Sequence, residues 1–294
     1  MAANWKVSLH GGHSGEYCEH AKGTLREMVE AAVGAGYHVF GVSEHAPRSQ
    51  QRFLYASEKE KGYDVERLAR EFDTYAAEMR ALQEEFAADL VLLRGFESES
   101  VPADSYAGEM NELRRRYNFD FVVGSVHHVE EVSIDGPKED FEKAVEACGG
   151  LEDLILRYYE QVAQMVESIK PDVVAHLDLP RLNAPADDAA LNSPKVRRRA
   201  DQTLDVIRSH QSILDVNTAA LRKGLPAPYP DGWLVRAAQG MRIPFCFGDD
   251  SHGPQQVGQG LEEARRHLLE HGVDHVVNLT LRHGTVVRER RMLG

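Results

Sequence analysis

The chain has 294 residues, with 34 Lys or Arg against 47 Asp or Glu, so its formal net charge is −13 with histidine neutral. This length permits two small domains or one α/β barrel of about 250 residues. Nucleic-acid backbones are bound by clustered Lys and Arg, so the acidic balance argues against nucleic acid as a partner. Histidine is unusually frequent, with 14 copies, and it is the commonest metal ligand.

Cysteine usage and hydropathy indicate the compartment. The three cysteines, Cys18, Cys148 and Cys246, are an odd number spread along the chain, which does not suit a disulfide framework and favours a reducing environment. The first residues lack a basic segment followed by a long apolar run, and no stretch reaches 18 consecutive apolar residues. We therefore expect a soluble cytoplasmic protein without a membrane partner. The sequence carries no signal for an oligomeric state.

Short apolar runs alternate with longer amphipathic segments along the chain. Strands are predicted at residues 7–9, 39–43, 90–94, 119–124, 173–175, 213–216 and 244–248, with an eighth apolar run at 275–279. A helix is predicted after Thr24, because Glu27 completes a capping box with it. Further helices are predicted at residues 64–87, 106–116, 151–169, 194–209, 231–239 and 261–271.

This order of elements predicts a parallel sheet covered by helices. Seven or eight strand–helix units without a low-complexity linker favour one closed α/β barrel that spans residues 1–294 as a single domain. A doubly wound open sheet is the alternative. The chain has no GxGxxG after its first strand and no GxxxxGK[ST], so the nucleotide-binding versions of the open sheet lose their main support.

Metal-binding side chains follow most of the predicted strands, where a βα barrel carries its chemistry. They are His10, His13 and His20 after the first strand, His45 after the second, Glu97 after the third, His127 after the fourth, His176 and Asp178 after the fifth, and Asp250 and His252 after the seventh. Half of the 14 histidines thus fall at one face. The remaining ones, among them His38, His210, His267, His271, His275 and His283, are expected to be solvated or hydrogen-bonded.

So many donors exceed the needs of one ion, because zinc takes four or five ligands and manganese or iron about six. We therefore predict a multinuclear site for divalent transition-metal ions, Zn, Mn or Fe, with Glu97 bridging two of them. Ions about 3.5 to 4 Å apart can hold a hydroxide and clamp phosphoryl oxygens. The predicted chemistry is hydrolysis of a phosphate ester.

Eight strings occur in a fixed order: LHGGHS, CEHA, GVSEHAP, GFESE, GSVHH, AHLDLPRL, LDVNTAALRKG and FGDDSHGPQQVG. Together they resemble the histidinol-phosphate phosphatases of the polymerase-and-histidinol-phosphatase (PHP) family, over residues 7–260. The resemblance implies a distorted seven-stranded TIM-like (β/α)7 barrel with a trinuclear centre. It also implies hydrolysis of L-histidinol phosphate to L-histidinol and phosphate, a step of histidine biosynthesis.

The resemblance implies nine ligands in three groups. One ion would be held by His10, His13, Glu97 and Asp250, a second by Glu97, His127 and His176, and a third by His20, His45 and His252. Two motifs depart from the family pattern. The usual HxH start is HGGH here, and the usual TDH or SDH is SEH, which places Glu44 beside His45. We expect Glu44 to orient a histidine by accepting its second ring N–H.

The predicted mechanism is attack of a metal-bound hydroxide on phosphorus, with Glu97 holding the ions. The leaving alkoxide would take a proton from His252, from Asp178 or from a metal-bound water. Phosphate also needs cationic partners, and arginine is the better clamp because it binds in a bidentate way. The predicted substrate-binding residues are Arg181, Arg222 and Arg48, with Asn217 and Thr218 at the end of the sixth strand.

Two kinds of alternative stay open. One is a PHP-type phosphodiesterase or nuclease, or a phosphatase for another small phosphorylated metabolite, which would use the same metals. A nuclease predicts a basic groove with aromatic platforms, whereas we interpret the clusters at residues 114–116 and 197–199 as solvated helix faces. The other alternative is a metal-binding barrel without catalytic activity. Glu99, Asp104 and Asp249 are candidates for receiving the cationic part of histidinol phosphate.

Overall fold

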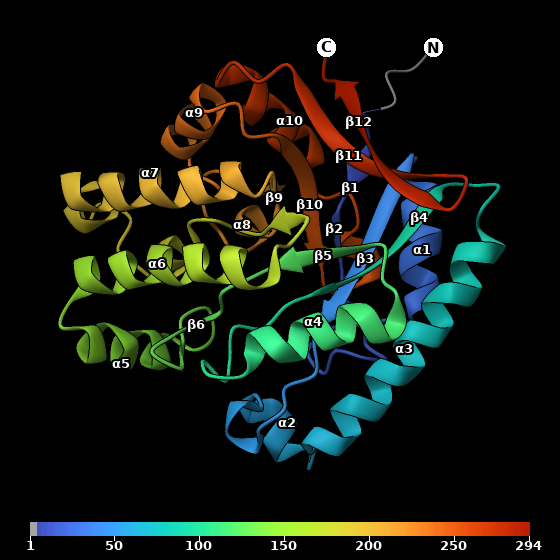
Figure 1. The fold of residues 1–294 in the computed structure, drawn as a ribbon, viewed down its shortest axis with the longest axis horizontal. Helices are drawn as coiled ribbons and strands as arrows, with labels where there is room; N and C mark the ends of the chain where they lie inside the picture. Colours follow the sequence, from blue (N-terminus) through green and yellow to red (C-terminus); the bar gives the residue numbers. More distant parts are fainter. Residues whose placement is uncertain (1–4) are drawn as a thin grey trace.

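Seven apolar segments lie side by side in a ring in the computed structural model, which describes residues 5–294 (Figure 1). Eight strands within this range form one sheet in the order β1-β3-β4-β5-β8-β9-β10-β2, and all its neighbouring pairs are parallel. Their bounds are β1 Val7–Ser8, β2 His10–Gly12, β3 Val39–His45, β4 Val91–Glu97, β5 Phe121–Gly124, β8 Val173–Val174, β9 Ile213–Asn217 and β10 Phe245–Ser251.

The first segment closes the ring. β1 pairs with β3, whereas β2 pairs with β10 on the other side. Only Leu9 separates β1 from β2, and its backbone N–H donates to the carbonyl of Phe247 at 2.9 Å. The two short strands together therefore occupy one strand position in the barrel. The predicted (β/α)7 barrel is confirmed. Several strands run further than predicted, so His45, Glu97 and Asp250 lie within strands rather than after them.

Helices cover the outside of the sheet (Figure 1). Their bounds are α1 Leu25–Gly34, α2 Ala56–Glu60, α3 Val65–Glu85, α4 Tyr106–Tyr117, α5 Lys138–Cys148, α6 Leu151–Ile169, α7 Pro194–Ser209, α8 Ala219–Arg222, α9 Gly232–Gly240 and α10 Leu261–Glu270. α1 begins with the predicted capping box, in which Thr24 accepts from Glu27 N and Glu27 accepts from Thr24 N. α2, α5 and α8 were not predicted. No helix in residues 5–294 is long and apolar enough to cross a membrane.

One large aromatic ring, that of Phe121, packs against neighbouring strands of the barrel. Phe121 is fully buried, and a Cβ at Gly95 or Gly41 would meet its ring at 2.4 Å or 2.7 Å. Both glycines are therefore needed on β3 and β4 so that the ring of β5 fits between the strands. This packing keeps the strands that carry the candidate site in a fixed register.

The eighth apolar run does not belong to the barrel, which corrects the expectation of an eighth strand–helix unit. It forms β11 (His275–Arg282), which pairs antiparallel with β12 (Thr285–Met292). The turn consists of His283 and Gly284, whose φ values of 52° and 76° suit a two-residue hairpin. The hairpin packs against β3, β4 and β10, beside the beginnings of β3 and β4 (Figure 1).

Candidate metal centre

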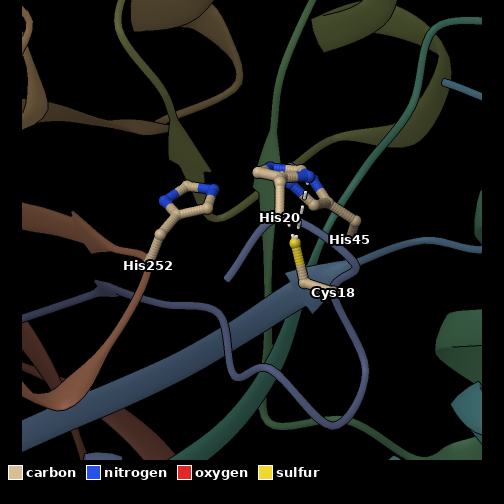
Figure 2. Close-up of side chains that lie close together, drawn as sticks. All are labelled: Cys18, His20, His45 and His252. Carbon is tan, nitrogen blue, oxygen red and sulfur yellow. Dashed lines mark hydrogen bonds between the residues drawn. The ribbon is translucent and has the colours of Figure 1, made fainter. Parts of the chain in front are cut away.

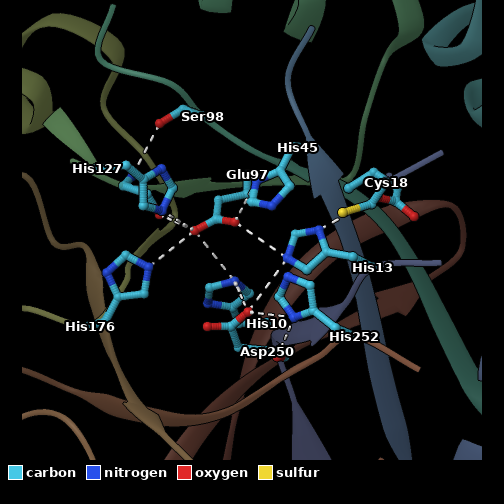
Figure 3. A network of polar contacts seen from close by, with 12 residues as sticks. His10, His13, Cys18, His45, Glu97, Ser98, His127, His176, Asp250 and His252 are labelled. Atoms are coloured by element: carbon cyan, nitrogen blue, oxygen red, sulfur yellow. Dashed lines mark hydrogen bonds and ion pairs between the residues drawn. The ribbon is translucent and has the colours of Figure 1, made fainter. Parts of the chain in front are cut away.

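Glu97, the last residue of β4, lies at the centre of a buried group of histidines (Figure 3). Its two carboxylate oxygens face different rings. Oε1 lies 3.2 Å from Nε2 of His127 and of His176 and 3.5 Å from Nε2 of His10, and Oε2 lies 3.4 Å from Nε2 of His13 and 3.1 Å from Nδ1 of His45. A carboxylate with separate nitrogen donors at each oxygen is suited to bridging two cations.

Asp250 supplies a second carboxylate to this group. Its Oδ1 lies 3.5 Å from Nε2 of His13 and 3.7 Å from Nδ1 of His252. β10 has one residue more than β2 between their paired positions, since Gly248 and Ser251 pair with His10 and Gly12, and Asp250 has a positive φ of 49° in this irregular step. We call His10, His13, Glu97, His127, His176 and Asp250 the carboxylate half of the centre.

The HGGH motif brings both of its histidines to the same cluster. In a regular strand, residues three positions apart point to opposite faces. Gly12 interrupts this alternation with a φ of 121°, and a Cβ there would lie 2.1 Å from the carbonyl oxygen of Ser251. Because only glycine fits this position, His13 turns back toward the side of His10, and both rings face Glu97.

A second group of donors lies beside the first and contains no carboxylate. Donor atoms of Cys18, His20, His45 and His252 all lie within 4.8 Å of one another (Figure 2). The ring of His13 stacks on that of His45 with centroids 4.0 Å apart, which joins the two groups. We call these four side chains the histidine half. Cys18 was not among the predicted ligands, although CEHA places it two residues before His20.

The donor atoms fit metal ions because several are buried without another partner. Within residues 5–294, His10 Nε2 and both ring nitrogens of His13 and His45 have no hydrogen-bond partner. Buried polar atoms are normally satisfied, so a convergent set of unpartnered imidazole nitrogens indicates that something else binds them. Imidazole and carboxylate donors are those that zinc, manganese and iron accept.

Carboxylates control the protonation of the carboxylate half. Burial lowers the pKa of His10 and His127, but nearby charges, chiefly that of Glu97, outweigh burial and raise both well above the usual range. The pKa of His13 rises to about 9 against the same opposing effect of burial, through Asp250 and Glu44. These imidazoles therefore hold protons that a metal ion would displace.

The histidine half behaves in the opposite way. Burial, with a smaller contribution from the charge on His13, lowers the pKa of His20 to about 4. The same two causes lower the pKa values of His45 and His252 well below the usual range. These three imidazoles are neutral near pH 7 and can offer ring lone pairs without first losing a proton.

Two buried carboxylates lie beside the Nδ1 atoms of ligand candidates. Glu44 accepts from the backbone N of Ser14 at 2.6 Å, and its other oxygen lies 3.4 Å from Nδ1 of His13. It thus faces His13 rather than its sequence neighbour His45. The second carboxylate is that of Asp215 on β9, whose Oδ2 lies 3.0 Å from Nδ1 of His10. Asp215 is not among the site residues predicted from the sequence. Its position within a strand, before the predicted strand end, gave no signal.

The predicted phosphate-binding arginines are engaged in internal contacts. Arg48 contacts Glu58 and lies over the ring of Tyr55. Arg181 pairs with Asp178 at 2.9 Å. Arg222 donates to the backbone carbonyls of Asp249 and Asp250, and to Thr218 Oγ1 at 3.1 Å. The guanidinium of Arg222 therefore supports the backbone that carries a ligand candidate.

The other predicted site residues have different surroundings. Asn217 Nδ2 lies 3.3 Å from Asp250 Oδ2. Asp178 follows His176 and lines a cavity of about 120 Å³ with, among others, Arg181, Asp231, Tyr159 and Trp233. Asp249 does not reach the mouth of the site, because it is fully buried and accepts from the hydroxyl of Tyr37 and the backbone N of Gly258.

Comparison with known proteins identifies the family. The PHP domain family matches residues 9–219. The chain belongs to the PHP family. A probable histidinol-phosphatase of Schizosaccharomyces pombe is 33% identical over 270 residues, which cover 91% of this chain and 87% of the relative. The chain spans most of that relative's length.

Two solved structures share the fold. A putative histidinol phosphatase from Listeria monocytogenes has a TM-score of 0.77 at 27% identity, covering 87% of this chain and 99% of its own. The histidinol phosphate phosphatase from Lactococcus lactis has a TM-score of 0.69 at 17% identity, covering 96% and 99%. The latter was solved with zinc, L-histidinol and phosphate.

Proposed function

We propose that this protein is a metal-dependent phosphomonoesterase that hydrolyses L-histidinol phosphate to L-histidinol and phosphate. The observation that carries the proposal is the Glu97 carboxylate, which has three imidazoles at one oxygen and two at the other. Relatives named as histidinol-phosphatases, aligned over most of the chain, support the choice of substrate.

We assign two or three divalent ions, Zn, Mn or Fe, to the cluster. The carboxylate half offers donors for two ions that share Glu97, and the histidine half offers His20, His45 and His252 for a third. When bound, such ions supply a nucleophilic water at neutral pH and neutralise charge on the phosphoryl oxygens. His10, His13, His127, His176 and Asp250 hold them in place.

The leaving alkoxide needs a proton, and the two predicted donors differ in their surroundings. Burial raises the pKa of Asp178, partly offset by Arg181, whereas burial lowers that of His252 well below its usual range. A carboxyl group with a raised pKa keeps its proton closer to neutrality. We therefore favour Asp178 over His252 as the proton donor.

The cavity beside Asp178 offers space for the alcohol portion of the substrate. Asp178 Oδ2 accepts from Arg181 and from the backbone N of Asp231, while Oδ1 has no hydrogen-bond partner in the part of the chain that the structure describes. Tyr159 and Trp233 contribute aromatic surface. A pocket with two carboxylates and aromatic walls suits an amine and an imidazole.

We retain Arg181, Arg222 and Arg48, with Asn217 and Thr218, as the proposed substrate-binding residues. Of these residues, Arg181 is the one that lines the cavity beside Asp178. The Arg181 guanidinium pairs with Asp178 and Asp231. To bind phosphate, it would have to give up part of this pairing and donate to phosphate oxygens instead. We also assign the activity to the cytoplasm, because all three cysteines are unpaired and buried.

The test is a phosphate-release assay with zinc- or manganese-loaded protein. L-histidinol phosphate is expected to turn over far faster than bis-p-nitrophenyl phosphate, whereas the reverse order would favour the phosphodiesterase alternative. His176→Ala and Asp250→Ala are expected to abolish turnover while the circular dichroism spectrum stays unchanged. Release of phosphate from no monoester by metal-loaded protein would refute the proposal.

A further inference from the structure

A buried carboxylate on β9, Asp215, contacts two ligand candidates, one on β2 and one that follows β8. It is 1% exposed, and its Oδ2 lies 3.0 Å from Nδ1 of His10. Its Oδ1 accepts from the backbone N of His176 at 2.7 Å. Oδ2 also accepts from Nδ2 of Asn217 at 3.0 Å. His10 and His176 are both ligand candidates at the Oε1 side of Glu97.

The contact with His10 fixes which ring nitrogen can bind a metal. A carboxylate accepts hydrogen bonds and cannot donate them when ionised, so His10 must donate through Nδ1. Once the ring is neutral, as metal binding requires, Nε2 carries the free lone pair, and this atom lies 3.5 Å from Glu97 Oε1. A hydrogen bond at the outer nitrogen is the usual device that orients a metal-binding histidine and sets its tautomer.

The contact with His176 acts on the backbone. His176 has a positive φ of 27°, which L-residues with side chains adopt rarely. Such a conformation persists only where the surroundings hold it. The hydrogen bond from its N–H to Asp215 is one such restraint, and it aims the ring toward Glu97, where Nε2 lies 3.2 Å from Oε1.

The space around Asp215 is shaped to fit a carboxylate against His10. Gly248 of β10 lies beside both residues, and a Cβ there would lie 2.7 Å from Asp215 Oδ2 and 2.9 Å from His10 Cβ. A side chain at position 248 would therefore push the carboxylate and the imidazole apart. The glycine allows β2, β9 and β10 to bring these two groups together.

We propose that Asp215 is the positioning residue for the Oε1 side of the metal centre, because it sets the tautomer of His10 and the backbone of His176 together. This inference rests on the metal centre proposed above. Asp215 would influence metal affinity without binding an ion itself, since its oxygens contact His10, His176 and Asn217.

Asp215→Asn tests the inference with almost no change in shape. All three partners of Asp215 are N–H donors, so an amide in either orientation places its NH2 group against at least one of them. We expect zinc affinity at the carboxylate half, measured by competition with a chromogenic chelator, to fall about 10- to 100-fold. Excess zinc is expected to restore much of the lost turnover, which a general folding defect would not allow.

Asp120→Asn is the matched control. Asp120 is half-buried beside β4, and its partners, Arg94 and Gln83, are likewise donors. It precedes β5, at the end of the barrel away from the ligands. Asp120→Asn is expected to lower the melting temperature in a similar way but to change zinc affinity less than about threefold.

The outcomes separate this inference from the proposed function. If Asp215→Asn binds zinc as tightly as the unmodified protein, the inference is wrong while the metal centre stands. If the unmodified protein binds no zinc, the proposed function fails as well. A second measurement needs no variant at position 215. Nitrogen NMR of the zinc-loaded protein, with the His10 signals assigned by their loss in His10→Gln, should show an Nδ1–H tautomer, and an Nε2–H tautomer would overturn the inference.

Discussion

The two halves of the proposed metal centre differ in charge, although both contain several histidines. In the carboxylate half, Glu97 and Asp250 raise the pKa of His10 well above its usual range against the effect of burial. In the histidine half, burial and the charge on His13 leave His252 with a strongly lowered pKa. In the carboxylate half, His10, His13 and His127 therefore hold protons when no metal is bound. In the histidine half, His20, His45 and His252 are already neutral.

This difference predicts different roles for ions bound on each side. Two carboxylates offset much of the charge of the ions that share Glu97. His20, His45 and His252, the ligands assigned to the third ion, are neutral and leave a divalent ion with its full charge. An anionic phosphoryl group is attracted to uncompensated positive charge, most strongly where water is excluded. We therefore expect the histidine half to contribute more to phosphate binding and the carboxylate half to hold ions more tightly.

Removing the charge of Glu97 should have the largest effect. Glu97→Gln keeps the size of the side chain but removes the charge that five imidazoles face. We expect kcat/KM for L-histidinol phosphate to fall about 1000-fold or more, roughly 4 kcal/mol, together with loss of at least one equivalent of metal by elemental analysis.

Glu99→Gln is the control for this change. Glu99 is as buried as Glu97, but it lies 3.5 Å from Nδ1 of His127 and 3.5 Å from Arg48, without bridging two groups of imidazoles. It is expected to lower activity about 10-fold. Equal losses in the two variants would contradict the bridging role of Glu97.

A substitution confined to the histidine half should be milder. His20→Ala removes one imidazole from Cys18, His45 and His252 and leaves every contact of Glu97 in place. We expect the protein to lose about one equivalent of metal and about 100-fold in kcat/KM, with KM rising because phosphate binding weakens. His38→Ala, outside the cluster and half-buried, should change neither quantity. Unchanged metal content in His20→Ala would remove the histidine half from the metal centre.

The helices and the donors were predictable because their signals are local. α6 and α7 have the predicted bounds, since each apolar stripe is bounded by a clear start such as Ser193 before Pro194. The ligand candidates could be found because parallel strands bring their carboxyl ends to one edge. The hairpin of β11 and β12 is not predicted, although His283-Gly284 is a turn signal. The alternation of strands and helices earlier in the chain favours a further barrel strand at residues 275–279.

Contacts between distant segments could not be predicted in this way. Asp215 contacts His10, which lies 205 positions away in the chain. The Glu44 carboxylate lies beside His13 and not beside its sequence neighbour His45. The positive φ values at Gly12 and Asp250 decide which way His13 and the carboxylate point, and they arise from a register shift between β2 and β10. Strand periodicity alone places these side chains on the wrong faces.

The opposite protonation of the two halves predicts how pH acts on metal-free protein. The pKa of His13 is raised to about 9, so its contribution to stability is complete below about 6.5 and is lost as pH rises from about 6.5 to 9. Metal-loaded protein needs the same imidazole unprotonated and does not lose this contribution. We expect the melting temperature of chelator-treated protein to fall over this range more than that of zinc-loaded protein. Parallel curves would show that His13 does not hold its proton in the metal-free state.

The smallest effect is expected far from both halves. Arg115 and Arg116 lie exposed on α4 and pair with Glu112 and Asp73. Exposed pairs of this kind contribute about 0 to 1 kcal/mol, and a phosphatase for a small substrate gains nothing from them. Arg115→Gln with Arg116→Gln should leave kcat/KM for L-histidinol phosphate within about twofold. If these arginines belonged to a nucleic-acid groove instead, the double variant would lose binding to a fluorescent oligonucleotide, and the salt dependence of that binding would become shallower.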